Sequence, residues 1–320
     1  MKEEQLQVGV IGVGSMGQHH ARVYSELDSV ALIGVTDADS SQADRIAEEY
    51  ETVAMTEDKL LDAVDAASVV VPTQYHLETA LHCIEHGVHV LIEKPIAANK
   101  QAAVEIIEAA EAADVIVQVG HIERFNPAIQ ELDRIVPVED IVAIRTERLG
   151  PPPERDIQDN SVVDLMIHDV DVVTGLLGGE PAAVSALGTR ENKYASATLQ
   201  FDSGVVATLI SSRLTQRKVR KLKITTKDKF IEVDYLDQTI EIYRQSAPEF
   251  INKDDGVHYR HESVIERPQV KNHEPLKKEI DSFVKSIRTN TTPVVSGRDG
   301  LRALELIQEI DESAKENDQT

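Results

Sequence analysis

The sequence is poor in cysteine and aromatic residues and contains no tryptophan. Its single cysteine, Cys83, excludes an internal disulfide and fits a reducing compartment. The position of Cys83 on a predicted helix favours a buried, inert thiol. No apolar run approaches the roughly 20 residues of a membrane-spanning helix, and no apolar signal segment precedes the first predicted strand. We therefore expect a folded cytoplasmic protein, and 320 residues are enough for two domains.

Positive charge is scarce as well. The chain has 33 basic and 56 acidic residues, and its formal net charge is −23. Such a charge argues against DNA, RNA and anionic membranes as partners. An acidic composition with few aromatic residues also suggests a proteome that is kept soluble at high salt.

One segment is basic, against this trend. It comprises Arg213, Arg217, Lys218, Arg220, Lys221, Lys223, Lys227 and Lys229, opposed by Asp228 alone. A solvated sheet edge protected by lysines is the simpler interpretation. A site for an anionic substrate or a neighbouring subunit is the alternative.

A glycine pattern follows the first predicted strand, Gln7 to Ile11, and leads into a helical stretch that runs to about Leu27. In Gly12-Val13-Gly14-Ser15-Met16-Gly17, the first glycine makes a tight turn and the second lets a pyrophosphate approach the backbone. The third glycine allows close packing of helix on strand. This strand–loop–helix context predicts a dinucleotide site.

The next strand, Val30 to Thr36, supports that prediction because it ends at Asp37, 20 residues after Gly17. An acid at this distance accepts hydrogen bonds from the adenosine ribose hydroxyls. No arginine follows immediately, so NAD is favoured over NADP; Arg45 keeps NADP as the alternative.

Strands and helices then alternate up to residue 119, which predicts a doubly wound parallel sheet. Polar residues follow the strand ends at Thr73, at Glu93-Lys94-Pro95 and in residues 120–127, where open α/β sheets bind ligands. We place the end of the first domain at residue 122 and assign residues 123–320 to the second. The expected cofactor contacts are Gly12, Gly14, Ser15, Met16, Gly17, Asp37, Thr73, His76, Glu93, Lys94 and Asn126.

A second group of polar residues lies in the predicted helix from Ser161 to Leu177. Asp164 and His168 are four residues apart and share one helix face, so they can meet the same substrate, with histidine as a base. An ordinary helical ion pair is one alternative, and a metal site at His168, Asp169 and Asp171 is another. The last two residues point away from the Asp164 face, which weakens the metal interpretation. His82, His86 and His89 are interpreted as surface histidines rather than metal ligands.

Beyond residue 181 the periodicity changes to two, which predicts an antiparallel, meandering sheet. We expect a polar, irregular excursion over residues 245–272 and two closing helices, Pro275 to Arg288 and Arg298 to about Lys315. The predicted fold is thus α/β, with an N-terminal Rossmann domain and a C-terminal α+β domain whose open sheet is mostly antiparallel.

The glycine pattern, Glu93-Lys94-Pro95, Asp164-x-x-x-His168 and the segment from Asn290 to Arg302 together resemble the Gfo/Idh/MocA oxidoreductases. The resemblance covers nearly the whole chain. It implies that Lys94 is the active-site lysine, that Asp164 and His168 are its partners, and that the Lys94–Pro95 bond is cis. It also implies a homodimer or homotetramer formed through the C-terminal sheet.

Within this family, residues 120–127 resemble the branch that acts on nucleotide-linked amino sugars. The resemblance implies hydride transfer to NAD from a sugar hydroxyl, with Arg124, Lys94, Asp164 and His168 on the substrate. Arg124 or the basic segment 213–229 would then meet the diphosphate. Two alternatives are a dehydrogenase of inositol or free sugars and a non-catalytic NAD-binding sensor.

Overall fold

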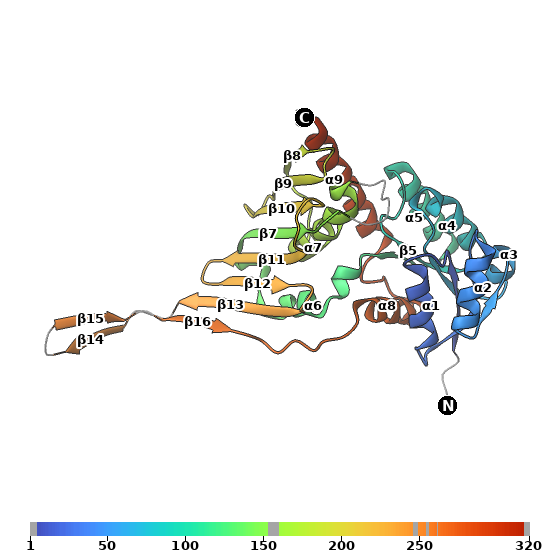
Figure 1. Cartoon of the computed structure of the whole chain (residues 1–320), viewed down its shortest axis with the longest axis horizontal. Coiled ribbons are helices and arrows are strands. Elements are labelled where there is room, and N and C mark those ends of the chain that lie inside the picture. Colours follow the sequence, from blue (N-terminus) through green and yellow to red (C-terminus); the bar gives the residue numbers. More distant parts are fainter. Residues whose placement is uncertain (1–4, 153–159, 246–248, 254–255, 261, 317–320) are drawn as a thin grey trace. The chain divides into compact units, whose positions relative to one another are not determined.

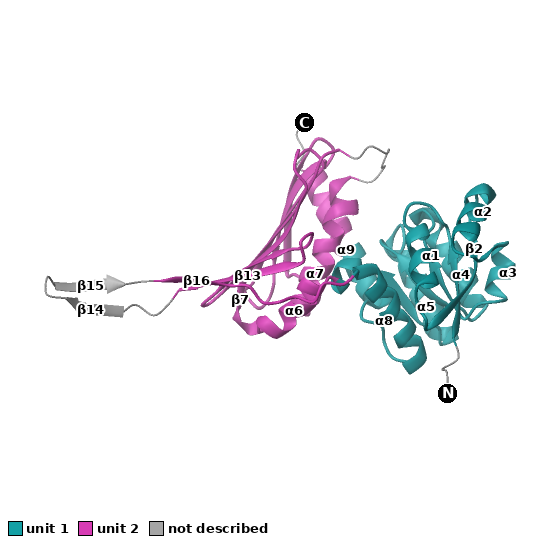
Figure 2. Cartoon of the chain, turned by 60° about the horizontal axis from the view of Figure 1, so that its bottom comes forward, with its two compact units in different colours: residues 1–125, 274–305 teal, residues 126–273, 306–320 magenta. Residues whose placement is uncertain are grey.

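The computed structural model describes residues 5–152, 160–245, 249–253, 256–260 and 262–316, with the backbone alone for 249–253 and 256–260. These residues form two compact units (Figure 2). Unit 1 comprises residues 1–125 and 274–305, and unit 2 comprises residues 126–273 and 306–320.

Unit 1 is built on a six-stranded parallel sheet with the order β3-β2-β1-β4-β5-β6. This is the strand order of a doubly wound dinucleotide-binding sheet, with its crevice at the β1/β4 switch point. The strands are β1 (Leu6–Ile11), β2 (Val30–Thr36), β3 (Val53–Ala54), β4 (Ala66–Val69), β5 (His89–Glu93) and β6 (Val117–Gly120). Its helices are α1 (Gly17–Ser25), α2 (Ser40–Glu49), α3 (Glu57–Leu61), η1 (Thr73–Tyr75), α4 (His76–Glu85), α5 (Lys100–Ala113), η2 (Ile122–Phe125) and α8 (Pro275–Thr289). Figure 1 labels β5 among these strands and the helices α1 to α5 and α8 of the same unit. The prediction of a parallel Rossmann sheet is confirmed.

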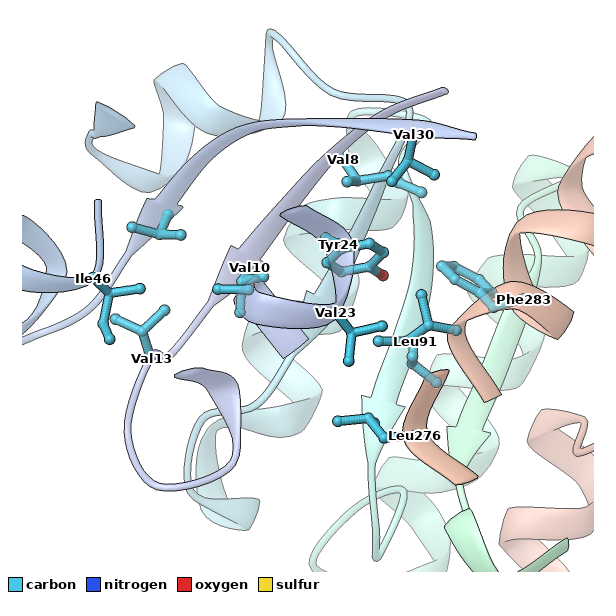
Figure 3. Packing of buried hydrophobic residues seen from close by; sticks show 14 of the residues in the cluster. Val8, Val10, Val13, Val23, Tyr24, Val30, Ile46, Leu91, Leu276 and Phe283 are labelled. Carbon is cyan, nitrogen blue, oxygen red and sulfur yellow. The ribbon is translucent and has the colours of Figure 1, made fainter. Parts of the chain in front are cut away.

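Helix α8 returns to unit 1 from the far end of the sequence. Its apolar face carries Leu276, Ile280 and Phe283, which are buried in one cluster with Tyr24 of α1 and Leu91 of β5 (Figure 3). Each such side chain contributes about 1.5–3 kcal/mol by burial. The observed units therefore differ from the predicted division into residues 1–122 and 123–320. The alternation of strand and helix locates the first boundary between the units, near residue 125. It gives no sign that residues 274–305 pack against unit 1.

Unit 2 contains an eight-stranded sheet with the order β16-β13-β12-β11-β7-β10-β9-β8. Its strands are β7 (Ile141–Leu149), β8 (Ala183–Thr189), β9 (Tyr194–Gln200), β10 (Val206–Ser212), β11 (Val219–Thr226), β12 (Phe230–Asp234), β13 (Thr239–Gln245) and β16 (Ser263–Glu266). All pairs are antiparallel except β7 with β10, which is parallel. The mostly antiparallel sheet is thus as predicted.

Helices cover one face of this sheet, as Figure 2 shows. They are α6 (Pro127–Ile135), η3 (Val138–Asp140), the π-helical turn η4 (Val162–Met166), α7 (Ile167–Leu177) and the later part of α9 (Gly297–Glu316), whose first residues belong to unit 1. The strand residues that face these helices are apolar, as at Ile144, Leu222 and Leu209, which are almost fully buried.

Two predictions about unit 2 are wrong. The segment 245–272 is not simply an irregular excursion, because β14 (Glu249–Lys253) pairs with β15 (Gly256–Arg260) and β16 pairs with β13. Residues 246–248, 254–255 and 261 of that segment lie outside the described residues. The basic segment does not form a sheet edge either, because β11 lies between β12 and β7.

Candidate active site

The glycine loop of unit 1 leaves no space for side chains at two of its three glycines. Gly12 has φ +86°, and a Cβ atom there would lie 2.8 Å from the Val70 carbonyl. A Cβ atom on Gly17 would lie 1.8 Å from the Gly12 oxygen. At Gly14, by contrast, no described atom lies within 4 Å of the Cβ position, and Ser15 and Met16 are exposed. The loop therefore packs tightly on one side and is open beside Gly14, which fits a bound pyrophosphate.

Asp37 is fixed beside this loop at the end of β2. Its Oδ2 accepts a hydrogen bond from the Val13 amide (2.7 Å), and its Oδ1 accepts one from the Asp39 amide (2.9 Å). Each carboxylate oxygen keeps a second lone pair for a ribose hydroxyl. Arg45 is paired with Glu49 on α2, at 3.0 Å between nitrogen and oxygen. These contacts fit the adenosine end of NAD.

Lys94 follows the last residue of β5, and its peptide bond to Pro95 is cis, as the family resemblance implies. The Lys94 amide donates to Glu93 Oε2 at 3.1 Å. The other Glu93 oxygen lies 3.2 Å from His20 Nε2. Burial alone would raise the pKa of Glu93, but the His20 hydrogen bond and the Lys94 charge outweigh it, so the net shift is downward. Glu93 is therefore ionised near neutral pH.

The His76 side chain supports the loop that follows Lys94. Its Nδ1 lies 2.9 Å from the Pro95 carbonyl oxygen and its Nε2 lies 2.9 Å from that of Val71. The ring is almost fully buried, and this burial lowers the pKa of His76. The imidazole thus connects two main-chain segments, and the cofactor contact of His76 stays a prediction. Thr73, at the start of η1, remains partly exposed.

The segment after β6 passes from unit 1 into unit 2. A Cβ atom on Gly120 would lie 3.1 Å from the Glu93 carboxylate, so a glycine there lets the two strand ends approach. Arg124 lies in η2 and is partly exposed. Asn126 is buried, caps α6 through the Ala128 amide (3.1 Å), and donates to the Tyr235 carbonyl (3.1 Å). Its amide is thus engaged within unit 2, although the sequence predicted a cofactor contact.

In unit 2, Asp164 lies on the π-helical turn η4 and His168 lies on the first turn of α7. Asn160 lies two residues before this turn, and its side-chain oxygen accepts from the Val162 amide (2.9 Å) and the Val163 amide (3.1 Å). The sequence predicted an ordinary α-helix here. Single π-helical turns are frequent at functional sites.

Asp164 has an arginine partner that the sequence did not reveal. Arg213, just after β10, donates from Nη2 to Asp164 Oδ2 at 2.5 Å. The arginine side chain is 9% exposed and the aspartate 26% exposed, so the pair is only partly screened by water. The sequence pattern groups Arg213 with the basic segment and gives no sign of a pairing with Asp164.

Asp169 belongs to a structural ion pair. Arg148 on β7 donates from Nε to one carboxylate oxygen (3.0 Å) and from Nη2 to the other (2.9 Å). Both side chains are at most 5% exposed, and the guanidinium carbon lies 5.1 Å from the centroid of the Tyr235 ring. Across the part of the chain that the structure describes, no three His, Cys, Asp or Glu side chains are grouped to hold a metal ion. Asp169 is therefore part of the support for α7.

Three lysines of the basic segment form ion pairs with acids of neighbouring elements. Lys221 pairs with Glu232, and Lys223 lies 2.9 Å from Glu147. Lys227 pairs with Asp140 at 3.0 Å. The lysines of β11 therefore neutralise carboxylates on the neighbouring strands β7 and β12, which is a different role from either interpretation of the sequence.

Two of the histidines near Cys83, His82 and His86, lie beside acids. His82 Nδ1 lies 2.7 Å from Glu57 Oε1, and this hydrogen bond raises the pKa of His82. Cys83 itself is fully buried, as predicted, and burial raises the pKa of its thiol. None of the described helices is both long and apolar enough to cross a bilayer.

Comparison with models of protein families identifies the family to which this fold belongs. Residues 6–121 match the family model described as an oxidoreductase family with an NAD-binding Rossmann fold, and residues 153–319 match its C-terminal alpha/beta domain. The chain therefore belongs to the Gfo/Idh/MocA oxidoreductases, and unit 1 carries the NAD-binding Rossmann fold of that family.

The chain is also similar to individual enzymes of this family. The chain is 34% identical over 304 residues to a UDP-N-acetylglucosamine 3-dehydrogenase from Acidithiobacillus ferrooxidans, which covers 93% of this chain and 94% of the relative. The crystal structure of that enzyme, GnnA, matches with a TM-score of 0.87 and covers 98% of this chain and 99% of the other. A scyllo-inositol 2-dehydrogenase (NAD(+)) from Bacillus subtilis is 26% identical over 328 residues, with 95% of this chain and 92% of the relative covered.

Proposed function

We propose that this protein oxidises a secondary hydroxyl of a nucleotide-linked amino sugar to a ketone, with NAD⁺ as the hydride acceptor. The observation that carries the substrate class is the full-length similarity to a UDP-N-acetylglucosamine 3-dehydrogenase. The similarity to an inositol dehydrogenase is lower and supports the chemistry rather than the substrate.

In this proposal the open side of the loop at Gly14 receives the pyrophosphate, together with the amides of Ser15 and Met16. Gly12 and Gly17 shape the loop, and Asp37 accepts from the ribose hydroxyls. The fixed carboxylate and the engaged Arg45 support a preference for NAD over NADP. Thr73 is a further side chain that we assign to the cofactor.

The catalytic roles are assigned to Lys94, Asp164 and His168. His168 takes the proton of the hydroxyl, because an imidazole is a good base near neutral pH. The Lys94 ammonium donates to the same oxygen and stabilises the alkoxide character that develops there. Asp164, held by Arg213, orients the sugar. NAD⁺ supplies the acceptor for the hydride of the carbon that is oxidised.

The substrate's diphosphate requires cationic groups, and Arg124 is the residue that we assign to it. Lys221, Lys223 and Arg213 already pair with acids of this chain, which makes them weaker candidates for binding the diphosphate. Arg217 and Lys218 are exposed and remain candidates.

We further propose that the chain forms a homodimer or homotetramer through the sheet of unit 2 and that it works in the cytoplasm. Apolar side chains on the sheet face opposite the helices support the first point. The strand register puts Leu187, Tyr194, Val206, Phe230 and Ile265 on that face, all at least 37% exposed.

The test is NAD⁺ reduction, followed by NADH absorbance, with UDP-N-acetylglucosamine, other UDP-sugars, inositols and free sugars, at low and high salt. We expect turnover with the UDP-amino sugar. Turnover with inositols or free sugars alone would keep the family chemistry and overturn the substrate class. No turnover with any of them, while NADH still binds, would favour a non-catalytic sensor.

A further inference from the structure

A fully buried histidine connects α1, the helix after the glycine loop, to β5, the strand that ends just before Lys94. His20 lies on α1, three residues beyond Gly17. Its Nδ1 is 3.0 Å from Ser68 Oγ on β4, and its Nε2 is 3.2 Å from Glu93 Oε1 on β5. All of these residues belong to unit 1.

The chain of hydrogen bonds extends one residue further, because the Tyr24 hydroxyl lies 2.9 Å from Ser68 Oγ. One arrangement of protons satisfies every group. Tyr24 donates to Ser68, Ser68 donates to Nδ1 of His20, and Nε2–H donates to the Glu93 carboxylate. In this arrangement every donor has an acceptor, and Glu93 is ionised.

The Glu93 carboxylate depends on this donor. An ionised carboxylate at 14% side-chain exposure is costly unless hydrogen bonds replace its water. The groups that face it are His20 on α1, the Lys94 amide and ammonium directly after β5, and Gly120 on β6. The next group of the chain is Tyr24, whose pKa is raised mainly by its own burial and, to a smaller extent, by the charge of Glu279 on α8.

We propose that His20 is a positioning residue for the reaction: its hydrogen bond keeps Glu93 ionised, and Glu93 in turn fixes the main chain at Lys94. The inference rests on the proposed function, in which Lys94 acts on the substrate oxygen. His20 touches neither substrate nor cofactor in this scheme and acts through Glu93.

Two variants separate the donor from the bulk of the ring. His20→Leu removes the donor, so burial raises the pKa of Glu93 and the carboxylate takes up a proton near neutral pH. His20→Gln keeps an N–H donor near the Nε2 position. The matched control is His19→Gln, because His19 is the exposed neighbour on the same helix.

We expect His20→Leu to lower kcat about 10- to 100-fold near neutral pH, because a displaced Lys94 is poorly aligned. The KM for NAD⁺ should change less than about twofold, since the loss lies in alignment rather than binding. Raising the pH should restore kcat as Glu93 loses its proton. His20→Gln should retain most of the activity, and His19→Gln should match the wild type.

A second readout needs neither substrate nor cofactor. In the wild type the depressed pKa of Glu93 contributes stability above its unfolded pKa, and this contribution is lost as the pH falls through the folded pKa. In His20→Leu the sign reverses, because a raised folded pKa gives stability at low pH that is lost as the pH rises. The stability gap between wild type and His20→Leu, measured by urea unfolding, should therefore widen as the pH rises from about 5 to about 7.

Glu93→Gln is the companion variant. It removes the titrating group, so its kcat should be low and should not recover at high pH. The double variant His20→Leu/Glu93→Gln should have the same pH dependence as Glu93→Gln alone. If His20→Leu does not fold, Glu93→Gln and His20→Gln still provide the comparison.

Equal, pH-independent losses in His20→Leu and His20→Gln would overturn the proposal, as would a stability gap that does not change with pH. If the wild type turned over none of the sugars, the proposed function would fail on its own, while the unfolding experiment would still decide how His20 and Glu93 are coupled.

Discussion

The two units hold several buried and partly buried carboxylates in different ways. In unit 1, Glu93 is held by a histidine and a main-chain amide, and Asp37 by two main-chain amides. In unit 2, Asp169 pairs with Arg148 of β7, and Asp164 pairs with Arg213 just after β10. Glu93 and Asp37 thus depend on local backbone geometry and one histidine donor, whereas Asp164 and Asp169 depend on permanently charged donors.

This difference predicts opposite sensitivities. The Glu93 network should respond to pH and to small changes of backbone, because its donors are amides and an imidazole. The arginine pairs should respond little to pH near neutrality and strongly to the loss of either charge. Four predictions test the contrast.

Lys94→Met should have the largest effect. We expect turnover to fall about 10³-fold or more, equivalent to about 4 kcal/mol, because the ammonium that stabilises the alkoxide is lost. NADH fluorescence should show that the cofactor still binds. Lys59→Met, at an exposed lysine of α3, is the control. Turnover within about threefold of wild type would remove Lys94 from the mechanism and leave unit 1 with binding alone.

Arg148→Met should cost about 3–5 kcal/mol of unfolding free energy, because it leaves Asp169 charged and buried without a partner. The double variant Arg148→Met/Asp169→Leu should recover most of that loss, since no buried charge remains. Urea unfolding measures both. A single-variant loss below about 1 kcal/mol would mean that water or another group compensates Asp169, and the contrast between the units would weaken.

Gly17→Ala and Gly14→Ala sharpen the description of the glycine loop. The first should cost about 1–3 kcal/mol, because its Cβ would collide with the Gly12 carbonyl. The second should leave stability within about 0.5 kcal/mol but weaken NADH binding, because its Cβ would occupy the open side of the loop. Unfolding and NADH titration separate the two effects. Normal NADH binding by Gly14→Ala would place the pyrophosphate elsewhere.

Arg213→Gln should have the smallest of the four effects. Asp164 is 26% exposed, so water replaces part of the lost hydrogen bond, and we expect a loss of stability of about 1 kcal/mol. The value of kcat/KM should fall about tenfold as Asp164 loses its orientation. Arg134→Gln, at an exposed arginine of α6 in the same unit, should change neither quantity. Equal losses in both variants would indicate a general charge effect instead of the Asp164 pair.

The parts of the fold that the sequence predicts are those encoded by nearby residues. The glycine loop, the acid at the end of β2 and the strand that ends at Glu93-Lys94-Pro95 each occupy a few consecutive positions, and the parallel sheet follows from their alternation. The strand periodicity of unit 2 is local in the same sense, and it predicts the mostly antiparallel sheet.

The supports of the candidate site could not be predicted in this way because they join distant positions. Arg213 lies 49 residues from Asp164, and Arg148 lies 21 residues from Asp169. The position of β11 inside the sheet depends on a pairing with β7. A run of lysines gives the same signal whether it lies at an edge or between strands that carry acids.

The return of α8 to unit 1 has a consequence for the synthesis of the chain. A nascent polypeptide that has left the ribosome up to residue 125 still lacks Leu276 and Phe283, which complete the apolar cluster around Tyr24. Unit 2 likewise includes residues 306–320 at the far end. Domains usually fold in the order in which they are made. Here neither unit is complete until nearly the whole chain has emerged. Translation pauses before residue 274 would therefore prolong the time in which the uncovered apolar residues of each unit are accessible to chaperones and proteases.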